Sequence, residues 1–389
     1  MDIKRRENES FLDWKYRIIE AKLKKEINLS WDNIVDLLGL DCHPGTLRKA
    51  AYGIIEAKRH YDKKLRASLS SDVLAEIEEK TREMNKERTK LQDYKREFVK
   101  FDKAEARFEA LLEEMARNMN TLPVLEKTQA QPFNPKHKRE GLAVFSDWHY
   151  GSLIDNAFNV YSPEVARKRI RKLVDKVIEY GHHNGVSTLH VAQLGDIISG
   201  SIHLTTRLFS DLTTVEQIQE VTEILAQVLA ELCNEFPKIV YYNIIGNHGR
   251  TVARKEEASI KDNFEYFICW YLRERLKDFD NIEIIEDREG IIATEIMGEK
   301  VLLAHGNYEK LGTAEGLHQM FGYMFNQVVF GHYHHNRQLE LGLTTEIIVN
   351  NSLCGVDEYA LTIRKASKPA QKLMIYNEDG LENIYNIRL

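Results

Sequence analysis

The chain has 389 residues, enough for a large core and for more than one domain of ordinary size. Its 54 basic and 60 acidic residues give a formal charge of −6, which excludes a polycation that coats nucleic acid through bulk charge. The four cysteines lie far apart without a CxxC pair, which argues against a disulfide framework and against a thiolate zinc site. A reducing compartment is therefore expected, and any contact with nucleic acid must be local.

The N-terminal stretch "MDIKRRENESFLDWKYR" lacks the apolar core that a signal peptide needs. No run in the chain reaches the roughly 18 apolar residues of a membrane span. We therefore expect a soluble, cytoplasmic protein that makes no membrane contact.

Residues 1–66 are predicted to be helical. The stretch "ESFLDWKYRIIEAKLKKEI" is amphipathic, and "SWDNIVDLLGL" begins with Ser30 as a helix N-cap. The turn "DCHPGT" then leads into a basic helix, an order that suggests a helix-turn-helix region that binds DNA. A small helical bundle with a solvated basic face is the alternative. The candidate DNA contacts are Arg48, Lys49, Lys58 and Arg59.

Residues 67–120 are predicted to form one long charged helix, because no Gly or Pro occurs from Leu74 to Met119. Many apolar residues there repeat at a seven-residue spacing, which is typical of a coiled coil. One line contains Ile77, Met84, Leu91, Phe98, Leu112 and Met119, interrupted by Glu105, and the adjoining line contains Tyr94, Phe101, Phe108 and Met115. This 77–119 helix is expected to form a homodimer or higher oligomer, or alternatively to fold back on its own chain.

Residues 121–140 contain three prolines and no periodicity, so they are predicted to be a linker. Residues 141–389 then alternate short β-branched runs with helical stretches such as "SPEVARKRIRKLVDKVIEYG" and "TTVEQIQEVTEILAQVLAELCNEF". This alternation predicts a layered α/β domain.

Five apolar runs in this domain end in polar residues. "LAVF" precedes Asp147 and His149, "LHVAQL" precedes Gly195-Asp196, "IVYYNII" precedes Gly246-Asn247-His248, "KVLLA" precedes His305, and "QVVF" precedes Gly331-His332-Tyr333-His334. Ligand sites in open α/β sheets form outside the carboxyl ends of the strands, so we expect these residues to converge.

The side-chain types point to metal chemistry. Several imidazoles with carboxylate and amide oxygens, and no thiolate, suit Mn, Fe, Zn or Ni better than calcium. Seven ligands are too many for one ion, but they suit two ions about 3.5 to 4 Å apart that share a carboxylate and promote a phosphoryl displacement. Two divalent ions, with Mn²⁺ as the first choice, are therefore the expected cofactors. A satisfied loop or core histidine is the alternative for any one of these residues taken alone.

The ordered set DxH, GD, GNH, H and GHxH resembles the motifs of the calcineurin-like metallophosphoesterase superfamily over residues 141 to about 360. The resemblance implies a four-layer α/β/β/α sandwich. It implies a first ion on Asp147, His149, Asp196 and His334, and a second ion on Asp196, Asn247, His305 and His332. Asp196 would then bridge the ions, and His248 would contact the phosphate and protonate the leaving oxygen. Tyr333 and His335 receive no metal role.

Protein phosphatases of this superfamily carry GDxxDRG and GNHE, whereas this chain has "GDIISG" and "GNHGR". Ser199 and Gly249 replace the acids, which argues against a protein phosphatase and leaves open what orients His248. The looser GD motif is more similar to SbcD-like DNA repair exonucleases and to related proteins of phages and prophages. Arg250 is expected to hold phosphate. His203 and Arg207 are further candidate substrate contacts, with ordinary loop residues as the alternative.

These features together predict a two-metal-dependent phosphodiesterase that hydrolyses DNA, a nuclease of phage or prophage DNA metabolism or repair. One alternative is a phosphodiesterase or phosphatase that acts on small nucleotides. Another, from a different class, is a DNA-binding or scaffolding protein with a structural metal site. Motifs indicate the chemistry, while the loops and the N-terminal region select the substrate.

Overall fold

The computed structural model describes residues 3–7, 9–68, 71–119, 121–128, 138–202, 206, 208–287, 289–364 and 366–389, except for the side chains of 65–68, 71–78, 93, 94, 96–108 and 359. Contacts divide the chain into two compact units, Met1–Lys103 and Ala104–Leu389. The boundary falls inside one long helix, so each unit is described by itself.

The N-terminal unit begins with three helices: α1 (Phe11–Leu23), α2 (Trp31–Leu38) and α3 (Pro44–Ser68). Their apolar faces enclose a small core that includes Ile18, Ile34 and Leu47. Ser30 is the N-cap of α2 as predicted, because its hydroxyl accepts a hydrogen bond from the backbone N–H of Asn33 at 3.0 Å.

The basic helix α3 presents most of the candidate DNA contacts to solvent. Arg48, Lys49 and Arg59 are exposed. Lys58 is engaged within the unit instead, because its ammonium lies 3.9 Å from an Asp13 carboxylate oxygen and 4.9 Å from the ring centroid of Tyr16. Lys58 therefore ties α3 to α1, and DNA binding by this unit stays a prediction.

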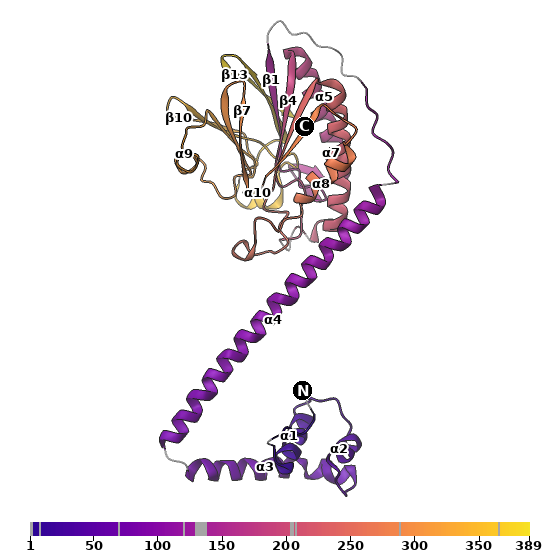
Figure 1. Ribbon diagram of the computed structural model, residues 1–389, viewed down its shortest axis with the longest axis vertical. Helices are drawn as coiled ribbons and strands as arrows, with labels where there is room; N and C mark the ends of the chain where they lie inside the picture. The colour runs from indigo at the N-terminus through magenta and orange to yellow at the C-terminus, as the bar shows by residue number, and fades with distance from the viewer. Residues whose placement is uncertain are drawn as a thin grey trace. The chain divides into compact units, whose positions relative to one another are not determined.

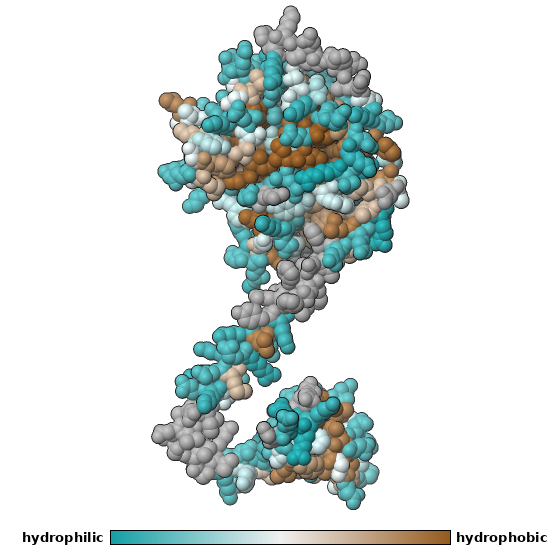
Figure 2. All heavy atoms as spheres, in the orientation of Figure 1, coloured by the Kyte–Doolittle hydropathy of each residue, from teal (hydrophilic) through white to brown (hydrophobic). Residues whose placement is uncertain are grey.

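Helix α4 (Ser71–Met119) crosses the boundary between the units. Met84 and Leu91 are 74% and 57% exposed, and Figure 2 shows mostly hydrophilic residues along the visible part of this helix. Leu111 and Met115, by contrast, are buried in the core of the C-terminal unit. The end of α4 thus packs on its own chain, and the coiled coil upstream stays a prediction. The seam side chains outside the described set are Ile77, Tyr94, Phe98, Phe101, Glu105 and Phe108.

The first part of the predicted linker is bonded to the C-terminal unit. The backbone N–H of Thr128 donates to the Asn234 side chain at 2.8 Å, and the Asn234 amide donates to the Glu126 carbonyl at 2.9 Å. Lys127 forms an ion pair with Asp280 at 2.9 Å. Residues 129–137 lie outside the described residues.

The C-terminal unit contains two sheets. The six-stranded sheet has the order β13-β12-β1-β4-β5-β6, in which β1, β4, β5 and β6 run parallel, and the five-stranded sheet has the order β10-β11-β9-β8-β7, in which β8, β9 and β11 run parallel. The strands of the first sheet are β1 (Arg139–Phe145), β4 (Val186–Leu194), β5 (Lys238–Ile244), β6 (Ile282–Glu286), β12 (Ala370–Asn377) and β13 (Gly380–Arg388). Those of the second are β7 (Ile291–Ile296), β8 (Glu299–Ala304), β9 (Gln327–Phe330), β10 (Arg337–Leu341) and β11 (Thr345–Val349). A separate hairpin joins β2 (Ile154–Asn156) and β3 (Asn159–Tyr161).

Apolar side chains pack on both faces of each sheet. One core, with Val144 of β1 and Leu303 of β8, lies between the two sheets. A second core lies between the six-stranded sheet and the helices α5 (Pro163–Asn184), α7 (Thr214–Glu235) and α8 (Tyr266–Arg275). A third covers the other face of the five-stranded sheet beside α9 (Glu315–Phe321). Figure 1 shows α5, α7 and α8 on the side of β1 and β4 away from β7 and β10. The mixed α/β prediction is confirmed.

Short helices complete the described chain, η1 (Lys255–Glu257) and α10 (Glu358–Thr362). None of the helices in the described ranges has an apolar stretch that would reach across a membrane.

Candidate metal centre

The predicted metal ligands all lie on loops that follow strands of the two sheets. Asp147 and His149 follow β1, Asp196 follows β4, Asn247 follows β5, His305 follows β8, and His332 and His334 follow β9. We call these five loops the ligand edge. The parallel strands end side by side, so residues nearly 190 positions apart in the chain meet there.

The backbone of the ligand edge is unusually strained. Five predicted ligands adopt a left-handed conformation with positive φ: Asp147 (52°), His149 (46°), Asp196 (52°), His332 (60°) and His334 (59°). Only three other non-glycine residues in the described part of the chain do so. Because this conformation costs about 1–3 kcal/mol per residue and persists where the surroundings impose it, its concentration here points to a functional site.

One group of ligand atoms gathers around Asp196. The His305 Nε2 atom lies 3.1 Å from the Asp196 Oδ2 atom and 3.1 Å from the Asn247 Oδ1 atom. The potential metal-ligating atoms of Asp196, His305 and His332 all lie within 4.8 Å of one another. Asp196 and His305 are each only 1% exposed. Two imidazoles, one carboxylate and one amide oxygen therefore come together here, and these are the ligands expected for the second ion.

A second group gathers around Asp147. The His334 Nε2 atom lies 3.3 Å from the Asp147 Oδ1 atom and 3.1 Å from the His149 Nε2 atom. His149 also has a donor atom within 4.8 Å of Asp196, which places Asp196 between the two groups. Both of these nitrogens can bind a metal through a lone pair when they carry no proton.

Backbone groups hold several of these side chains in place. The His332 N–H donates to both carboxylate oxygens of Asp147 at 3.0 Å. The His305 Nδ1 atom donates to the Leu194 carbonyl at 2.7 Å, so Nε2 is the ring nitrogen that faces Asp196. These contacts fix the ligand orientations before any ion binds.

His248 is oriented by a backbone carbonyl. Its Nδ1 atom lies 2.8 Å from the Ser199 carbonyl oxygen, which accepts the hydrogen bond, and its Nε2 atom lies 4.0 Å from the Asp196 Oδ2 atom. Its ring centroid is 4.6 Å from that of His149. The sequence left the orienting group open because an acid is missing at Gly249. Ser199 supplies it through the main chain, which no side-chain motif could reveal.

The charge state of the ligand edge suits cation binding. Burial opposes ionisation of Asp196, but the neighbouring His305 holds the pKa of that carboxyl well below its usual range. Burial lowers the pKa of His149 well below its usual range and lowers the pKa of His332 to about 4. Against the effect of burial, Asp196 raises the pKa of His305 to about 10 and Asp147 raises the pKa of His334, so a bound metal would displace a proton from these two rings. The ionised carboxylates and the neutral rings of His149 and His332 are already in the forms that bind divalent metals. The residues present thus fit the two ions.

A cavity of about 270 Å³ opens beside these groups. His149 and His248 line it at the ligand edge. Its other walls combine apolar side chains with two acids, and they include Leu153, Ile154, Phe209, Cys354, Asp357 and Glu358. This position next to the expected proton donor makes it a candidate site for the group that leaves the phosphate.

Of the three predicted substrate contacts, the structure describes only Arg250. Arg250 lines a small cavity with Asn247, and its Nη2 atom donates to the Ala253 carbonyl at 3.4 Å. His203 and Arg207 lie outside the described residues. The ring Nδ1 of His335 lies 2.6 Å from the Tyr333 carbonyl, and neither residue belongs to a described group of potential metal ligands.

Sequence reasoning missed Asn263 and Glu265, two buried residues behind the ligand edge. The available signal was the glycine in "GNHGR". A Cβ atom at Gly249 would lie 2.2 Å from the Asn263 Oδ1 atom and 2.9 Å from the Glu265 Cγ atom. The space that an acid after GNH would need is filled from a segment 14 to 16 residues downstream.

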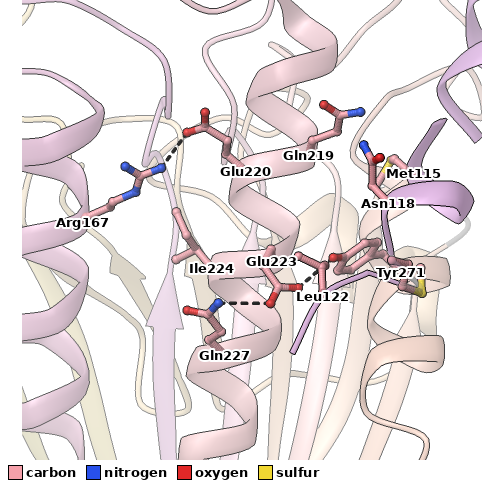
Figure 3. A pocket seen from close by; sticks show the side chains of 11 residues that line it. Met115, Asn118, Leu122, Arg167, Gln219, Glu220, Glu223, Ile224, Gln227 and Tyr271 are labelled. Atoms are coloured by element: carbon pink, nitrogen blue, oxygen red, sulfur yellow. Dashed lines mark hydrogen bonds and ion pairs between the residues drawn. The ribbon is translucent and has the colours of Figure 1, made fainter. Parts of the chain in front are cut away.

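A different cavity, of about 370 Å³, lies between α4, α5, α7 and α8 (Figure 3). Two pairs of its polar groups bond each other: Arg167 with Glu220 at 2.8 Å, and Glu223 with the Tyr271 hydroxyl at 2.7 Å. No predicted site residue lines it. We call the outer surface of α5, α7 and α8 the helical face.

Comparisons with known proteins bear on the whole chain. No model of a known protein family matches it. It is 26% identical over 388 residues to the SPbeta prophage-derived uncharacterized protein YonJ of Bacillus subtilis (strain 168), a match that spans 96% of this chain and 95% of that protein. The similarity therefore extends across both the helical N-terminal unit and the unit with the ligand edge.

The chain also resembles solved structures. Vacuolar protein sorting 29 from Cryptosporidium parvum is 12% identical with a TM-score of 0.33, and the match covers 65% of this chain and 100% of that one. A predicted phosphoesterase from Streptococcus pneumoniae TIGR4 is 12% identical with a TM-score of 0.26, covering 64% and 98%. Vps29 from Chaetomium thermophilum is 9% identical with a TM-score of 0.29, covering 64% and 95%. TM-scores this low do not support a functional assignment. The function is therefore inferred from the residues of the ligand edge.

Proposed function

We propose that this protein is a two-metal-dependent phosphodiesterase that hydrolyses DNA, built on the four-layer α/β/β/α sandwich of the calcineurin-like metallophosphoesterases. The observation that carries the proposal is the convergence of carboxylate, amide and imidazole groups from five loops, with His305 Nε2 at 3.1 Å from Asp196 and His334 Nε2 at 3.3 Å from Asp147. This mixture of nitrogen and oxygen ligands suits divalent transition metals.

The first ion would be held by Asp147, His149, Asp196 and His334, and the second by Asp196, Asn247, His305 and His332. When bound, two such ions, for which Mn²⁺ fits this mixture of oxygen and nitrogen ligands, activate water and neutralise charge that develops on the phosphate. The buried position of Asp196 between both groups is what suits it to be shared.

The protein's own groups would complete the reaction. The Ser199 carbonyl accepts from Nδ1 of His248, so Nε2 is the nitrogen that faces the ligand edge. His248 would contact the phosphate and deliver a proton to the departing 3′ or 5′ oxygen. The cavity that begins at His149 and His248 would accept the leaving group.

Two observations support DNA as the substrate. Arg48, Lys49 and Arg59 form an exposed basic group on α3, the kind of surface that contacts backbone phosphates. The similar protein from Bacillus subtilis is described as prophage-derived, which supports a role in phage or prophage DNA metabolism or repair.

A second candidate function is hydrolysis of small nucleotides. The observation that favours it is the cavity beside His248, whose 270 Å³ has the size of a compartment for one small organic group rather than a groove for a polymer. A terminal nucleotide of DNA would also fit there, so the cavity is compatible with an exonuclease.

The first test is cleavage of end-labelled single- and double-stranded DNA by the purified full chain in Mn²⁺, with EDTA and Asp196→Ala as controls. Metal-dependent cleavage that is lost in the variant supports the proposal, and the product ladder separates exonuclease from endonuclease action. Intact DNA beside turnover of a small phosphodiester would favour the second candidate.

A charge reversal on α3 sharpens this distinction. Arg48→Glu with Lys49→Glu should weaken DNA binding and reduce its salt dependence by about one unit of slope for each lost phosphate contact. Turnover of a small phosphodiester should be unchanged, because both residues lie outside the ligand edge. Unaltered DNA affinity and salt slope would remove the N-terminal unit from the proposal.

A further inference from the structure

Behind the ligand edge lies a fully buried carboxylate, Glu265, that is not itself one of the predicted metal ligands. One of its oxygens, Oε1, accepts hydrogen bonds from the backbone N–H groups of Ile197 at 2.6 Å and Ile198 at 3.3 Å. The other, Oε2, accepts from the N–H of Gly246 at 2.6 Å. The same side chain therefore bonds the loop that follows β4 and the loop that follows β5.

An acidic residue at the start of a helix usually accepts a hydrogen bond from the backbone of that helix, and Glu265 does not. Glu265 is the N-cap residue of α8, but its backbone is helical and its side chain makes no capping bond to that helix. Because both oxygens point away from α8, this one side chain makes three hydrogen bonds to the two loops.

Asn263 completes the attachment from the same segment. Its side-chain amide donates to the Gly246 carbonyl at 2.7 Å, and its Oδ1 atom accepts from the Glu265 N–H at 2.9 Å. The Phe264 N–H donates to the Gly249 carbonyl at 2.8 Å. The segment 263–265 thus bonds the loop after β5 on both sides of Asn247 and His248.

The two loops also touch each other directly. A Cβ atom at Gly195 would lie 2.4 Å from the Gly246 backbone nitrogen, and one at Gly246 would lie 2.1 Å from the Asp196 backbone nitrogen. Backbone packed this closely transmits a small shift of one loop to the other. Asp196 sits on the first loop and Asn247 on the second, and both are predicted ligands of the second ion.

We infer that Glu265 is a positioning residue that fixes the loop of Asp196 against the loop of Asn247 and His248, and so sets the ligand spacing of the second metal site. This inference rests on the metal site proposed above. It also gives "GNHGR" a physical reason, because Gly249 leaves room for the segment that carries this carboxylate.

The test compares the full-length wild type with Glu265→Gln, which keeps the shape but turns one acceptor into a donor that faces backbone N–H groups. Calorimetric titration with Mn²⁺ measures the affinity of each ion, and electron paramagnetic resonance reports the magnetic coupling of an ion pair. We expect affinity for one of the two ions to fall by about 10- to 100-fold, the range found when groups that support ligands are altered, and the coupled signal to give way to that of isolated Mn²⁺. Unchanged affinity for both ions, with the coupled signal intact, would overturn the inference.

The matched control is Glu223→Gln, which alters a half-buried acid on the helical face that bonds Arg275 and Tyr271. It should lower thermal stability without changing Mn²⁺ affinity or the coupled signal. A second variant, Gly249→Ala, would bring a methyl group against the Asn263 side chain. It should lower the affinity for the same ion. Equal loss of Mn²⁺ affinity in Glu223→Gln would show a general effect of stability and would contradict a positioning role.

Amide hydrogen exchange of the metal-free protein provides a readout that does not depend on the proposed function. In Glu265→Gln, exchange should accelerate in residues 195–198 and 246–249 while β12 and α5 keep the wild-type rate. If the wild type binds no Mn²⁺ but this local acceleration is seen, the metal proposal fails and the attachment of the loops stands. Wild-type exchange in both loops would overturn the attachment itself.

Discussion

The ligand edge and the helical face of the C-terminal unit both bury charged groups, but they satisfy them in opposite ways. On the helical face, Glu223 accepts hydrogen bonds from Arg275 and from the Tyr271 hydroxyl, so its charge is neutralised by the protein. At the ligand edge, Asp147 and Asp196 face imidazoles whose nitrogens point toward the same space.

The backbone shows the same contrast. The N-cap residues Ser162 and Thr213 precede the helices α5 and α7, and their side chains cap these helices in the ordinary way. At the ligand edge five non-glycine residues hold left-handed conformations. Buried charge with protein partners contributes to stability, whereas buried charge held on strained loops is arranged for an added cation. The following variants test that difference in order of expected effect.

Replacement of the shared carboxylate should have the largest effect. Asp196→Ala removes an oxygen that lies 3.1 Å from His305 and belongs to both groups of ligands. We expect both ions to be lost and turnover to fall by at least about 10³-fold, because stabilisation of the transition state depends on them. Metal analysis after dialysis, together with the DNA cleavage assay, measures this. Full retention of two ions would contradict the role of Asp196 as a bridge.

His248→Ala separates proton donation from metal binding. We expect turnover to fall by about 10²- to 10⁴-fold, the usual contribution of a positioned acid or base. Metal content should match the wild type, because His248 is assigned to the phosphate. Loss of the ions in this variant would instead make His248 a ligand, a role that the grouping of its ring with His149 and Asp196 within 4.8 Å allows.

Glu223→Gln tests the other side of the comparison. Arg275, which is only 8% exposed at its side chain, would lose a charged partner at 2.8 Å. We expect the free energy of unfolding to fall by about 2–3 kcal/mol, below the range for breaking a fully buried ion pair, because Glu223 is half-buried. Chemical denaturation measures the change, and DNA cleavage by the folded variant should equal that of the wild type. A large loss of activity would mean that the helical face is coupled to the ligand edge.

Lys372→Met concerns a buried charge without an acidic partner in the described residues. Burial lowers the pKa of Lys372 from 10.5 to about 8. The unfolded chain therefore binds more protons between pH 8 and pH 10.5, so the lysine costs stability below pH 8 and the cost fades as pH rises through that window. We expect Met to raise the free energy of unfolding by about 1–2 kcal/mol at pH 7, less than the full shift because the bond to Asn336 is lost. If the gain in free energy of unfolding were the same at pH 10.5 as at pH 7, the buried charge of Lys372 would not be its cause.

Much of the fold and of the site could be predicted from the sequence. The β-branched runs and their polar endings predicted β1, β4, β5, β8 and β9, because strand periodicity and ligand chemistry are local signals. Parallel strand order then brings the endings to one edge. Asp147 and Asp196 could be identified from their motifs without a prediction of the chain between them.

Other features depend on contacts that no local pattern encodes. The Ser199 carbonyl orients His248 through the main chain, and Glu265 reaches the loops from a segment without a recognisable motif. The seven-residue spacing in α4 predicted a partner helix, yet Leu111 and Met115 pack against the core of their own unit. An apolar stripe specifies that something covers it, but not whether the cover comes from the same chain.

The most direct measurement of the central claim is the number of Mn²⁺ ions bound per wild-type chain, determined by metal analysis after equilibrium dialysis. The arrangement around Asp147 and Asp196 predicts two ions, with both lost in Asp196→Ala. A wild-type chain that binds no Mn²⁺, or that binds the same number of ions as Asp196→Ala, would contradict the claim that the ligand edge is a two-metal site.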